Sequence, residues 1–553
     1  MTNYEIMLSR HDDETARLLA AQETDPGSPL CGAFIDSNGQ TDTRGCGFAL
    51  AHLAKSFLIP GSRYYHDSAV RAAMERALDF LFAHLRPGGC MDYACCNFAS
   101  APDTAFTVNE VISAHGLLER DASPASGWLR MPLLRLIEAC CEGICAGGFH
   151  TPNHRWAIAA CLKHGARICE RPDFAARADV YLGEGLDINS DGEFAERSAG
   201  NYNQVNDDQM LRLYLATGDR RFLEAARANL SMMLYYVDPD GSVFTNNSTR
   251  QDNGRKVYLE SYYVLYLLTG YLLQDEALAA FGEYCWRTAT AHGQVPGGVE
   301  WLALYPQMEG FSRRRTPEVG RVEHYSRLFA DSGIGRVRRG DFSCTVMARK
   351  PDFLYFQHGA NVVSLAIYGN VCEKRNFIPT GIEQTKDGFR VTASVDSWYY
   401  LPYDGDGPAT SDWWSMDNER TRKKLISDTL SITADISIGE DGAEVTLRAE
   451  GLSGVPVRLE WGFLPGCRLR SEHFLMAAAP GGSMTVCHGT LQATDGKGDC
   501  VSVGPAFARH ADQDRMGGAY PLRADRFTVF FTDYTPFERT VRISADRAFG
   551  LGL

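Results

Sequence analysis

Residues 129–170, LRMPLLRLIEACCEGICAGGFHTPNHRWAIAACLKHGARICE, contain two helical patterns separated by a break. In the first pattern apolar side chains recur three and four positions apart, as at Leu133, Leu136 and Cys140. A Gly-Gly pair interrupts this pattern, and Pro152 then precedes a second apolar run. The stretch therefore predicts two antiparallel helices joined by a short loop.

The same alternation of helix and break continues from about residue 13 to about residue 292. Helices are predicted over residues 69–85, 104–118, 129–145, 154–170, 174–186, 204–216, 221–237, 257–272 and 276–288. Many paired helices of similar length with short connections are typical of a solenoid, or of the same pairs closed into a ring. The aromatic, Asn and Asp content of the loops favours a ring with a working face, an (α/α) toroid that is complete or incomplete.

The pattern changes after about residue 310, where apolar and polar residues begin to alternate. Residues 428–437, 443–449, 457–463 and 526–531 are predicted to be strands, with turn residues between them. Residues 312–317, SRRRTP, are a plausible junction. We expect an α+β protein of two domains, a helical toroid over residues 1–312 and an antiparallel β-sandwich over residues 313–553.

Charge and composition limit the class of partner. The 553-residue chain has a net charge of -14 at pH 7, which argues against nucleic acid as a ligand. An acidic glycan would need local positive groups to meet its carboxylates. No segment has the length and apolarity of a transmembrane helix, and no secretory signal is visible. These features predict a cytoplasmic protein that does not bind membranes, or a secreted or periplasmic one if a signal was removed.

The sixteen cysteines are expected to be free thiols, because several lie in apolar helical runs. Their spacing matches no zinc-ligand pattern, so no cofactor is predicted and metal dependence is left open. The oligomeric state is not indicated.

Asn153 and His154 are expected at the start of a helix, directly after Pro152. Backbone N–H groups and the helix dipole favour anions at this position. An Asn beside a His there can bind a carboxylate. The alternative is an Asn that caps the helix beside a solvated His.

A second polar stretch, residues 191–203, reads DGEFAERSAGNYN and precedes the next helix. Tyr202 within it is a candidate acid or base, or else a packing Tyr whose hydroxyl caps a helix. Asp207 and Asp208 follow on that helix and are alternative catalytic carboxylates.

His358 lies in residues 355–364, YFQHGANVVS, which are predicted to form one strand of the second domain. A lone His in a strand is more often structural. Residues 90–106 form another polar region, in which Asn97 precedes a helix that Asp103 or Thr104 can cap. The further candidate contacts to a sugar are Arg155, Trp156, Asn97, Glu196, Asn201, Tyr262, Trp413 and Trp414.

Taken together, these motifs resemble the heparinase II/III-like polysaccharide lyases and the related alginate lyases. In that group an Asn-His pair opens a toroid helix, a Tyr follows an Asp-Gly…Glu-x-Ser stretch, and a further His comes from the β-domain. Asn153-His154, Tyr202 and His358 occur in this order. The segment 329–338, FADSGIGRVR, is similar to the group's entry into the β-domain. The group's His-x-His-Ala-Asp motif differs from the His-Gly-Ala-Asn of residues 358–361.

The resemblance implies a polysaccharide or oligosaccharide lyase that acts on a uronic-acid-containing glycan by β-elimination. Asn153 with His154 or His358 would neutralise the substrate carboxylate, and Tyr202 and a His would act as acid and base. An inverting glycoside hydrolase on the same toroid, of the unsaturated-uronyl type, is the main alternative and needs two carboxylates. Its candidate acids are Asp103, Asp191, Glu196, Asp207, Asp208 and Glu260. A glycan-binding protein without catalysis is a third possibility.

Overall fold

The computed structural model describes residues 1–149, 151–371, 374–402, 410, 412–415, 423–512, 514–515 and 517–547. The chain divides into two compact units. The helical unit comprises Met1–Tyr236 and Gly241–Val319, and the sheet unit comprises Val237–Asp240 and Gly320–Leu553. The main division of the structure therefore follows Val319.

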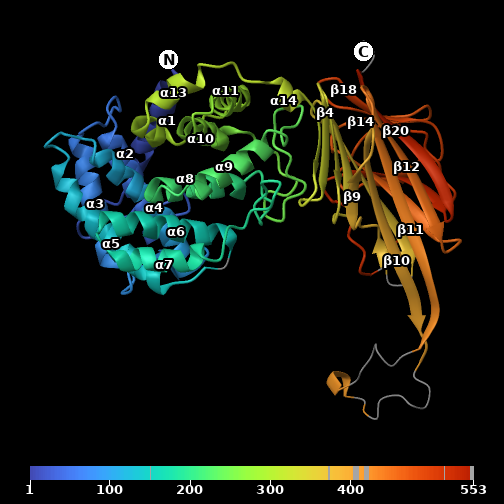
Figure 1. Cartoon of the computed structure of the whole chain (residues 1–553), viewed down its shortest axis with the longest axis horizontal. Helices are drawn as coiled ribbons and strands as arrows, with labels where there is room; N and C mark the ends of the chain where they lie inside the picture. The colour runs from blue at the N-terminus through green and yellow to red at the C-terminus, as the bar shows by residue number, and fades with distance from the viewer. Residues whose placement is uncertain are drawn as a thin grey trace. The chain divides into compact units, whose positions relative to one another are not determined.

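The helical unit is built from successive antiparallel helix pairs (Figure 1). The pairs are α2 (Thr43–Leu58) with α3 (Ser68–His84), α4 (Ala101–Leu118) with α5 (Arg130–Ala146), α6 (Pro152–Ile168) with α7 (Pro172–Leu182), α8 (Tyr202–Thr217) with α9 (Arg220–Met233), and α10 (Tyr263–Leu273) with α11 (Glu276–Ala291). The first helix of each pair packs on the first helix of the next, so α2, α4, α6, α8 and α10 form an inner row. This arrangement confirms the predicted toroid.

The two ends of the helical unit also meet. Helix α1 (Asn3–Ala21) packs on α2 and on α12 (Val299–Leu304), and α12 packs in turn on α4 and α10. The short helix α13 (Gln307–Ser312) covers α10 and α11. Because the inner helices are covered on all sides, they carry apolar residues all round, as in α10, where Tyr263–Gly270 are all buried.

Local signals explain where the helices begin. Thr2 and Glu5 form a capping box on α1, and the side chains of Asp42, Asp67 and Ser100 accept hydrogen bonds from the first turns of α2, α3 and α4. The predicted helix over residues 257–272 begins later than expected, because residues before α10 form a loop and the short 3-10 helix η2 (Glu260–Tyr262). Apolar content alone did not separate that loop from the helix.

The sheet unit contains two nine-stranded sheets among the described residues. One has the order β16-β19-β13-β7-β6-β5-β4-β3, with β8 paired to β7, and the other has the order β15-β14-β17-β18-β20-β12-β11-β10-β9. The bounds are β3 (His324–Phe329), β4 (Ile334–Arg339), β5 (Phe342–Met347), β6 (Asp352–His358), β7 (Asn361–Val371), β8 (Lys374–Asn376), β9 (Gly381–Gln384), β10 (Gly388–Tyr400), β11 (Lys424–Ile438), β12 (Gly442–Gly451), β13 (Pro456–Phe463), β14 (Arg468–Arg470), β15 (Leu475–Ala477), β16 (Ser483–Thr485), β17 (Leu491–Thr494), β18 (Asp499–Gly504), β19 (Phe527–Tyr534) and β20 (Phe537–Arg547).

Side chains from both sheets share one apolar core, which makes the unit a sandwich. Figure 1 shows the strands of the unit, from β4 to β20. Phe356 and Trp461 contribute from one sheet, and Phe389, Ile436 and Val541 contribute from the other. The paired strands are antiparallel except for β16 and β19, which run parallel. The predicted antiparallel sandwich is confirmed.

One predicted strand is wrong. Residues 355–364 are not a single strand but part of a hairpin, in which β6 ends at His358 and β7 begins at Asn361. Gly359 makes this turn with a φ of +52°, and a Cβ there would lie 1.8 Å from a carboxylate oxygen of Asp499. The Gly that follows His358 is therefore required by the turn.

In the described part of the chain, every helix is too short or too polar to cross a membrane. The cysteines that the structure describes are free thiols, as predicted. Cys140 and Cys161 are buried, and Cys169 is partly exposed.

Candidate functional site

The start of α6 binds a carboxylate, and that carboxylate belongs to the chain itself. Glu196 Oε2 accepts a hydrogen bond from the backbone N–H of Asn153 at 3.2 Å, and Oε1 accepts one from the Asn153 amide at 2.7 Å. Asn153 is 1% exposed, and its amide also donates to Thr151 at 3.3 Å. The anion-binding position predicted from the sequence is therefore occupied by Glu196.

Glu196 in turn connects Asn153 to Tyr202 through Arg250. The Nε of Arg250 lies 3.7 Å from Glu196 Oε1. The Arg250 guanidinium lies over the Tyr202 ring, 4.8 Å from its centre. Asn153, Glu196, Arg250 and Tyr202 thus form one group of contacts, which we call the α6–α8 cluster.

The electrostatics of this cluster depend on burial. Burial raises the pKa of Glu196 above its usual value, while the hydrogen bonds from Asn153 and the charge of Arg250 act in the opposite direction. Glu196 is 3% exposed, whereas the Arg250 side chain keeps 27% of its surface exposed. Arg250 is therefore the charged member of the cluster that a ligand can reach.

Asp252 holds together the two loops that carry the cluster. Its Oδ1 accepts hydrogen bonds from Ser198 and Ser248 at 2.8 and 2.6 Å, and its Oδ2 accepts one from the Gly200 backbone at 2.9 Å. The Ser198 hydroxyl then accepts the Tyr202 N–H at 3.0 Å. This network fixes the start of α8, and with it the position of Tyr202.

His154 projects from the first turn of α6 toward α4. It is half-buried, and its ring packs edge-on against Phe106 at 6.0 Å. At the start of α4, Asn97 donates to Asp103 at 3.4 Å, and Arg44 of α2 lies 3.3 Å from the other Asp103 oxygen. Because the inner helices all run in one direction, these groups lie at the same end of the toroid as the α6–α8 cluster.

Three of the predicted sugar contacts, Arg155, Trp156 and Tyr262, are buried in the structure. Trp156 is fully buried, so it cannot stack on a sugar. Arg155 lies over the Trp156 ring at 4.1 Å and donates to the Gly185 carbonyl at 2.7 Å, which ties α6 to the loop after α7. Tyr262 is 1% exposed and donates to the Ala199 carbonyl at 2.5 Å. These side chains support the site without forming its surface.

The remaining predicted contacts differ in their surroundings. Asn201 is half-buried and is the N-cap residue of α8, without a side-chain cap bond. Trp413 and Trp414 lie in the 3-10 helix η3 (Trp413–Ser415) of the sheet unit and are 65% and 90% exposed. Most of residues 403–418 lie outside the described residues, and a role for the two Trp side chains stays a prediction.

His358 belongs to the sheet unit, where it is held by its neighbours. Its Nδ1 lies 2.9 Å from the Cys500 carbonyl, and its Nε2 lies 3.5 Å from Asp341. The residue is 3% exposed. These contacts account for His358 as a residue that joins β6 to β18, and its predicted catalytic role stays a prediction.

Several of the carboxylates considered for hydrolysis already form hydrogen bonds or ion pairs within the protein. Asp208 accepts the Arg212 Nε–H at 2.6 Å, Asp103 pairs with Arg44, and Glu196 serves Asn153. Asp207 is different, because it is fully buried and neither oxygen has a hydrogen-bond partner in the described part of the chain. Burial and the nearby Asp208 raise its pKa well above the ordinary value, which favours the protonated acid. Within the described ranges, no group of three or more His, Cys, Asp or Glu side chains is arranged to hold a metal ion.

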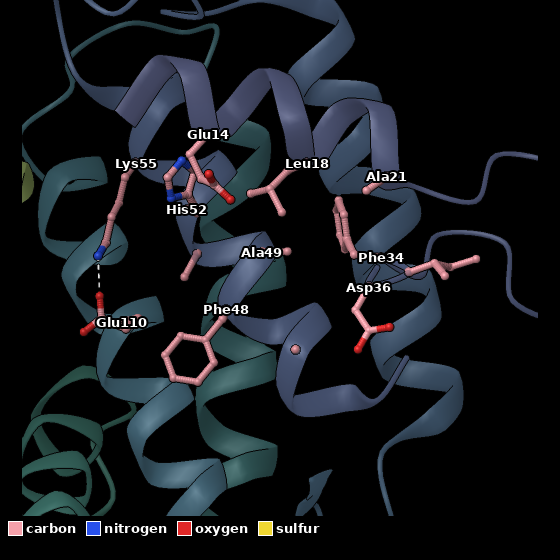
Figure 2. Close-up of a pocket in the computed structure, with 13 residues that line it drawn as sticks. Glu14, Leu18, Ala21, Phe34, Asp36, Phe48, Ala49, His52, Lys55 and Glu110 are labelled. Carbon is pink, nitrogen blue, oxygen red and sulfur yellow. Dashed lines mark hydrogen bonds and ion pairs between the residues drawn. The ribbon is translucent and has the colours of Figure 1, made fainter. Parts of the chain in front are cut away.

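A separate pocket of about 390 Å³ lies along α1 and α2 (Figure 2). Phe34, Leu18 and Phe48 form apolar walls, and Lys55 reaches Glu110 of α4. Lys55 also donates to Glu300 at 2.8 Å, so two carboxylates neutralise its charge. The pocket contains none of the predicted site residues.

The fold of the chain is similar to that of several solved structures, although its sequence is not similar to that of known families. No family model matches the chain, and no curated protein matches its sequence. Among solved structures, a Paenibacillus xanthan lyase matches with a TM-score of 0.58 at 10% identity, over 99% of this chain and 57% of its own. A Streptomyces coelicolor A3 chondroitin AC lyase in complex with chondroitin sulphate gives 0.51 at 13%, over 99% and 78%. Heparinase III gives 0.53 at 11%, over 99% and 85%.

These similarities establish the fold, a helical toroid joined to antiparallel sheets. The remote resemblance to the heparinase-like group is confirmed at that level. The chain spans little more than half the length of the xanthan lyase that it matches.

Arg250 is the residue of the cluster that the sequence analysis missed. It lies in residues 245–254, TNNSTRQDNG, a polar loop between two predicted helices. The density of Asn, Asp, Ser and Thr in this loop was a usable signal, because glycan sites are often built from such loops on a rigid scaffold.

Proposed function

We propose that the protein is a lyase that cleaves a uronic-acid-containing glycan by β-elimination, with its chemistry centred on Tyr202 and Arg250. The observation that carries the proposal is the α6–α8 cluster. It places a half-buried Tyr beneath an accessible Arg, which is paired with a buried carboxylate. The fold that the chain shares with three glycan lyases supports the same reaction class.

Elimination needs a base, an acid and positive charge. Removal of the proton at C5 of the uronate leaves an enolate-like dianion, which fixed positive groups stabilise. The electron pair of the C5–H bond then forms the C4–C5 double bond while the C4–O bond breaks. Tyr202 takes the C5 proton as its phenolate and returns a proton to the departing oxygen.

Arg250 supplies the positive charge in this scheme. It lies over the Tyr202 ring, where it stabilises a phenolate, and its exposed surface can meet the substrate carboxylate. His154 is half-buried in the first turn of α6, next to Asn153 of the α6–α8 cluster, and is the second group proposed to contact that carboxylate.

Asn153 receives a different role from the one expected for it. Because its amide donates to Glu196 and Thr151 and is almost fully buried, we assign it to holding Glu196 in place. Glu196 then anchors Arg250. The two residues position the catalytic groups without touching the substrate.

The test is an ultraviolet-absorbance screen of the purified protein against xanthan, chondroitin, heparan and other uronate glycans and their oligosaccharides. Elimination leaves a conjugated double bond that absorbs, and hydrolysis leaves none. Tyr202→Phe is compared with Tyr214→Phe, which removes a hydroxyl from a half-buried Tyr further along the same helix. We expect absorbance to rise with the wild type and Tyr214→Phe and to be lost with Tyr202→Phe.

Two results would contradict the proposal. New reducing ends without absorbance would indicate hydrolysis and move the chemistry to carboxylates such as Glu196. Equal turnover by Tyr202→Phe and the wild type would remove Tyr202 from the reaction.

A further inference from the structure

A second pocket of about 620 Å³ lies in the helical unit, at the carboxyl ends of the inner helices α4, α6 and α8. The first turns of α5 and the end of α12 complete its wall. Apolar and aromatic side chains form part of the lining, among them Ile112, Met131, Leu215, Trp301 and Tyr305. A volume of this size accommodates a ligand as large as a disaccharide.

The charged lining of this pocket is strongly basic. Arg120, Arg130, Arg167 and Arg212 line it, whereas Glu119 is the single carboxylate among the residues that form it in the described structure. The chain as a whole carries a net charge of -14, so this local excess of positive charge runs against the composition.

Three of these arginines differ in the ion pairs that they form. Arg212 is buried and paired with Asp208 and Glu110 at the inner end of the pocket. Arg130 pairs with Glu119 at the exposed surface. Arg167, exposed in the last turn of α6, makes no ion pair with any residue that the structure describes.

Two histidines, His115 and His164, also line the pocket. Burial, together with the charges of Arg167 and Arg212, lowers the pKa of His164 to about 3. Burial also lowers the pKa of His115, with Arg130 and Arg167 acting in the same direction and Glu119 against them. Both rings are therefore neutral near pH 7, and the positive charge of the lining comes from the arginines.

The pocket is distinct from the candidate active site. Asn153 and Arg167 stand at opposite ends of α6, and a helical rise of 1.5 Å per residue separates them by about 21 Å. A ligand in this pocket therefore does not touch the α6–α8 cluster.

We propose that this basic pocket binds an organic polyanion of about disaccharide size that carries at least two carboxylate, sulfate or phosphate groups. The planar guanidinium forks match such oxyanions bidentately. The apolar and aromatic wall accommodates the carbon framework between the charges. None of the residues of the α6–α8 cluster lines the pocket, so binding there is independent of the proposed lyase activity.

The experiment is isothermal titration calorimetry on the full chain with a doubly sulfated uronate disaccharide, a sugar bisphosphate, inorganic sulfate and inorganic phosphate. Arg167→Gln and Arg130→Gln each remove one charge from the pocket. Arg227→Gln removes one from the exposed surface of α9, where Arg227 pairs with Glu224. Thermal unfolding checks that each variant folds.

At least one of the two organic probes is expected to bind more tightly than the inorganic ions. Each pocket variant should weaken that binding about tenfold, the effect of losing one charge-assisted hydrogen bond. Arg227→Gln and Tyr202→Phe should bind like the wild type, which separates this pocket from the active site. Preference between the sulfated and the phosphorylated probe identifies the source of the oxyanion. Absence of binding at millimolar concentration, or binding that neither pocket variant weakens, would overturn the proposal.

Discussion

Replacement of Arg250 by Gln removes the positive charge over Tyr202 while keeping a side chain of similar length. The guanidinium carbon lies 4.8 Å from the centre of the Tyr202 ring. At an effective dielectric constant of about 20, a unit positive and a unit negative charge at that distance attract by about 3.5 kcal/mol. This is the interaction that a Tyr202 phenolate would lose.

Solvent reduces this value, because the Arg250 side chain is 27% exposed. Taking about half of the attraction leaves roughly 1.5–2 kcal/mol. If the phenolate forms in the reaction, Arg250→Gln should lower kcat/KM by about 10- to 30-fold.

The assay is the initial rate of absorbance increase on the glycan that gives turnover in the screen. The control is Arg197→Gln, because Arg197 is 28% exposed, lies in the neighbouring loop and is 3.5 Å from Glu193. Both variants lose one positive charge. Within the described structure, Arg250 lies over the Tyr202 ring and Arg197 does not. A similar loss of activity in both variants would show a general field effect, and full activity of Arg250→Gln would refute the assignment.

Three further variants test the framework of the site. Glu196→Ala leaves the buried Asn153 amide without its main acceptor and should lower the free energy of unfolding by about 2–4 kcal/mol in urea titrations; no change would mean that the bonds contribute nothing. Asp207 has a raised pKa in the folded state, so its contribution to stability is present below the unfolded value near 3.8 and is lost as pH rises toward the folded pKa. Asp207→Asn should remove that decline in urea titrations run between about pH 5 and about pH 8, and an unchanged slope would exclude Asp207 as its source. Tyr262→Phe should reduce the free energy of unfolding by about 1 kcal/mol and leave KM unchanged, since the hydroxyl bonds a backbone carbonyl inside the protein; a raised KM would return Tyr262 to the substrate surface.

The sequence was most informative where the signal is local. The spacing of apolar residues, together with the Gly and Pro residues between elements, predicted most helices of the toroid and the main strands of the sandwich. This is because a buried face repeats every 3.6 residues in a helix and every second residue in a strand. Pro152 marked the start of α6, and the Asp-Gly pair at residues 191–192 marked a turn in which Gly192 has a φ of +90°.

The same local reasoning did not identify the environment of a residue for which two environments were plausible. Trp156 follows the Asn-His pair directly, yet it faces the core, because the inner helices are covered on all sides and leave only their ends accessible. His358 ends strand β6, and Gly359 after it makes the hairpin turn into β7. Neither outcome can be read from spacing along the chain.

By itself, the sequence determined the two-domain fold class, since periodicity, Pro and Gly act over a few residues. It placed Asn153 and His154 at the start of a helix and Tyr202 in the polar loop before the next one. Only the tertiary structure decided which charges meet. Glu196 occupies the start of α6, and Arg250, from another loop, lies over Tyr202. The physical reason is that an ion pair or a ring contact depends on distance through space, and the closing of the helical ring sets that distance independently of separation along the chain.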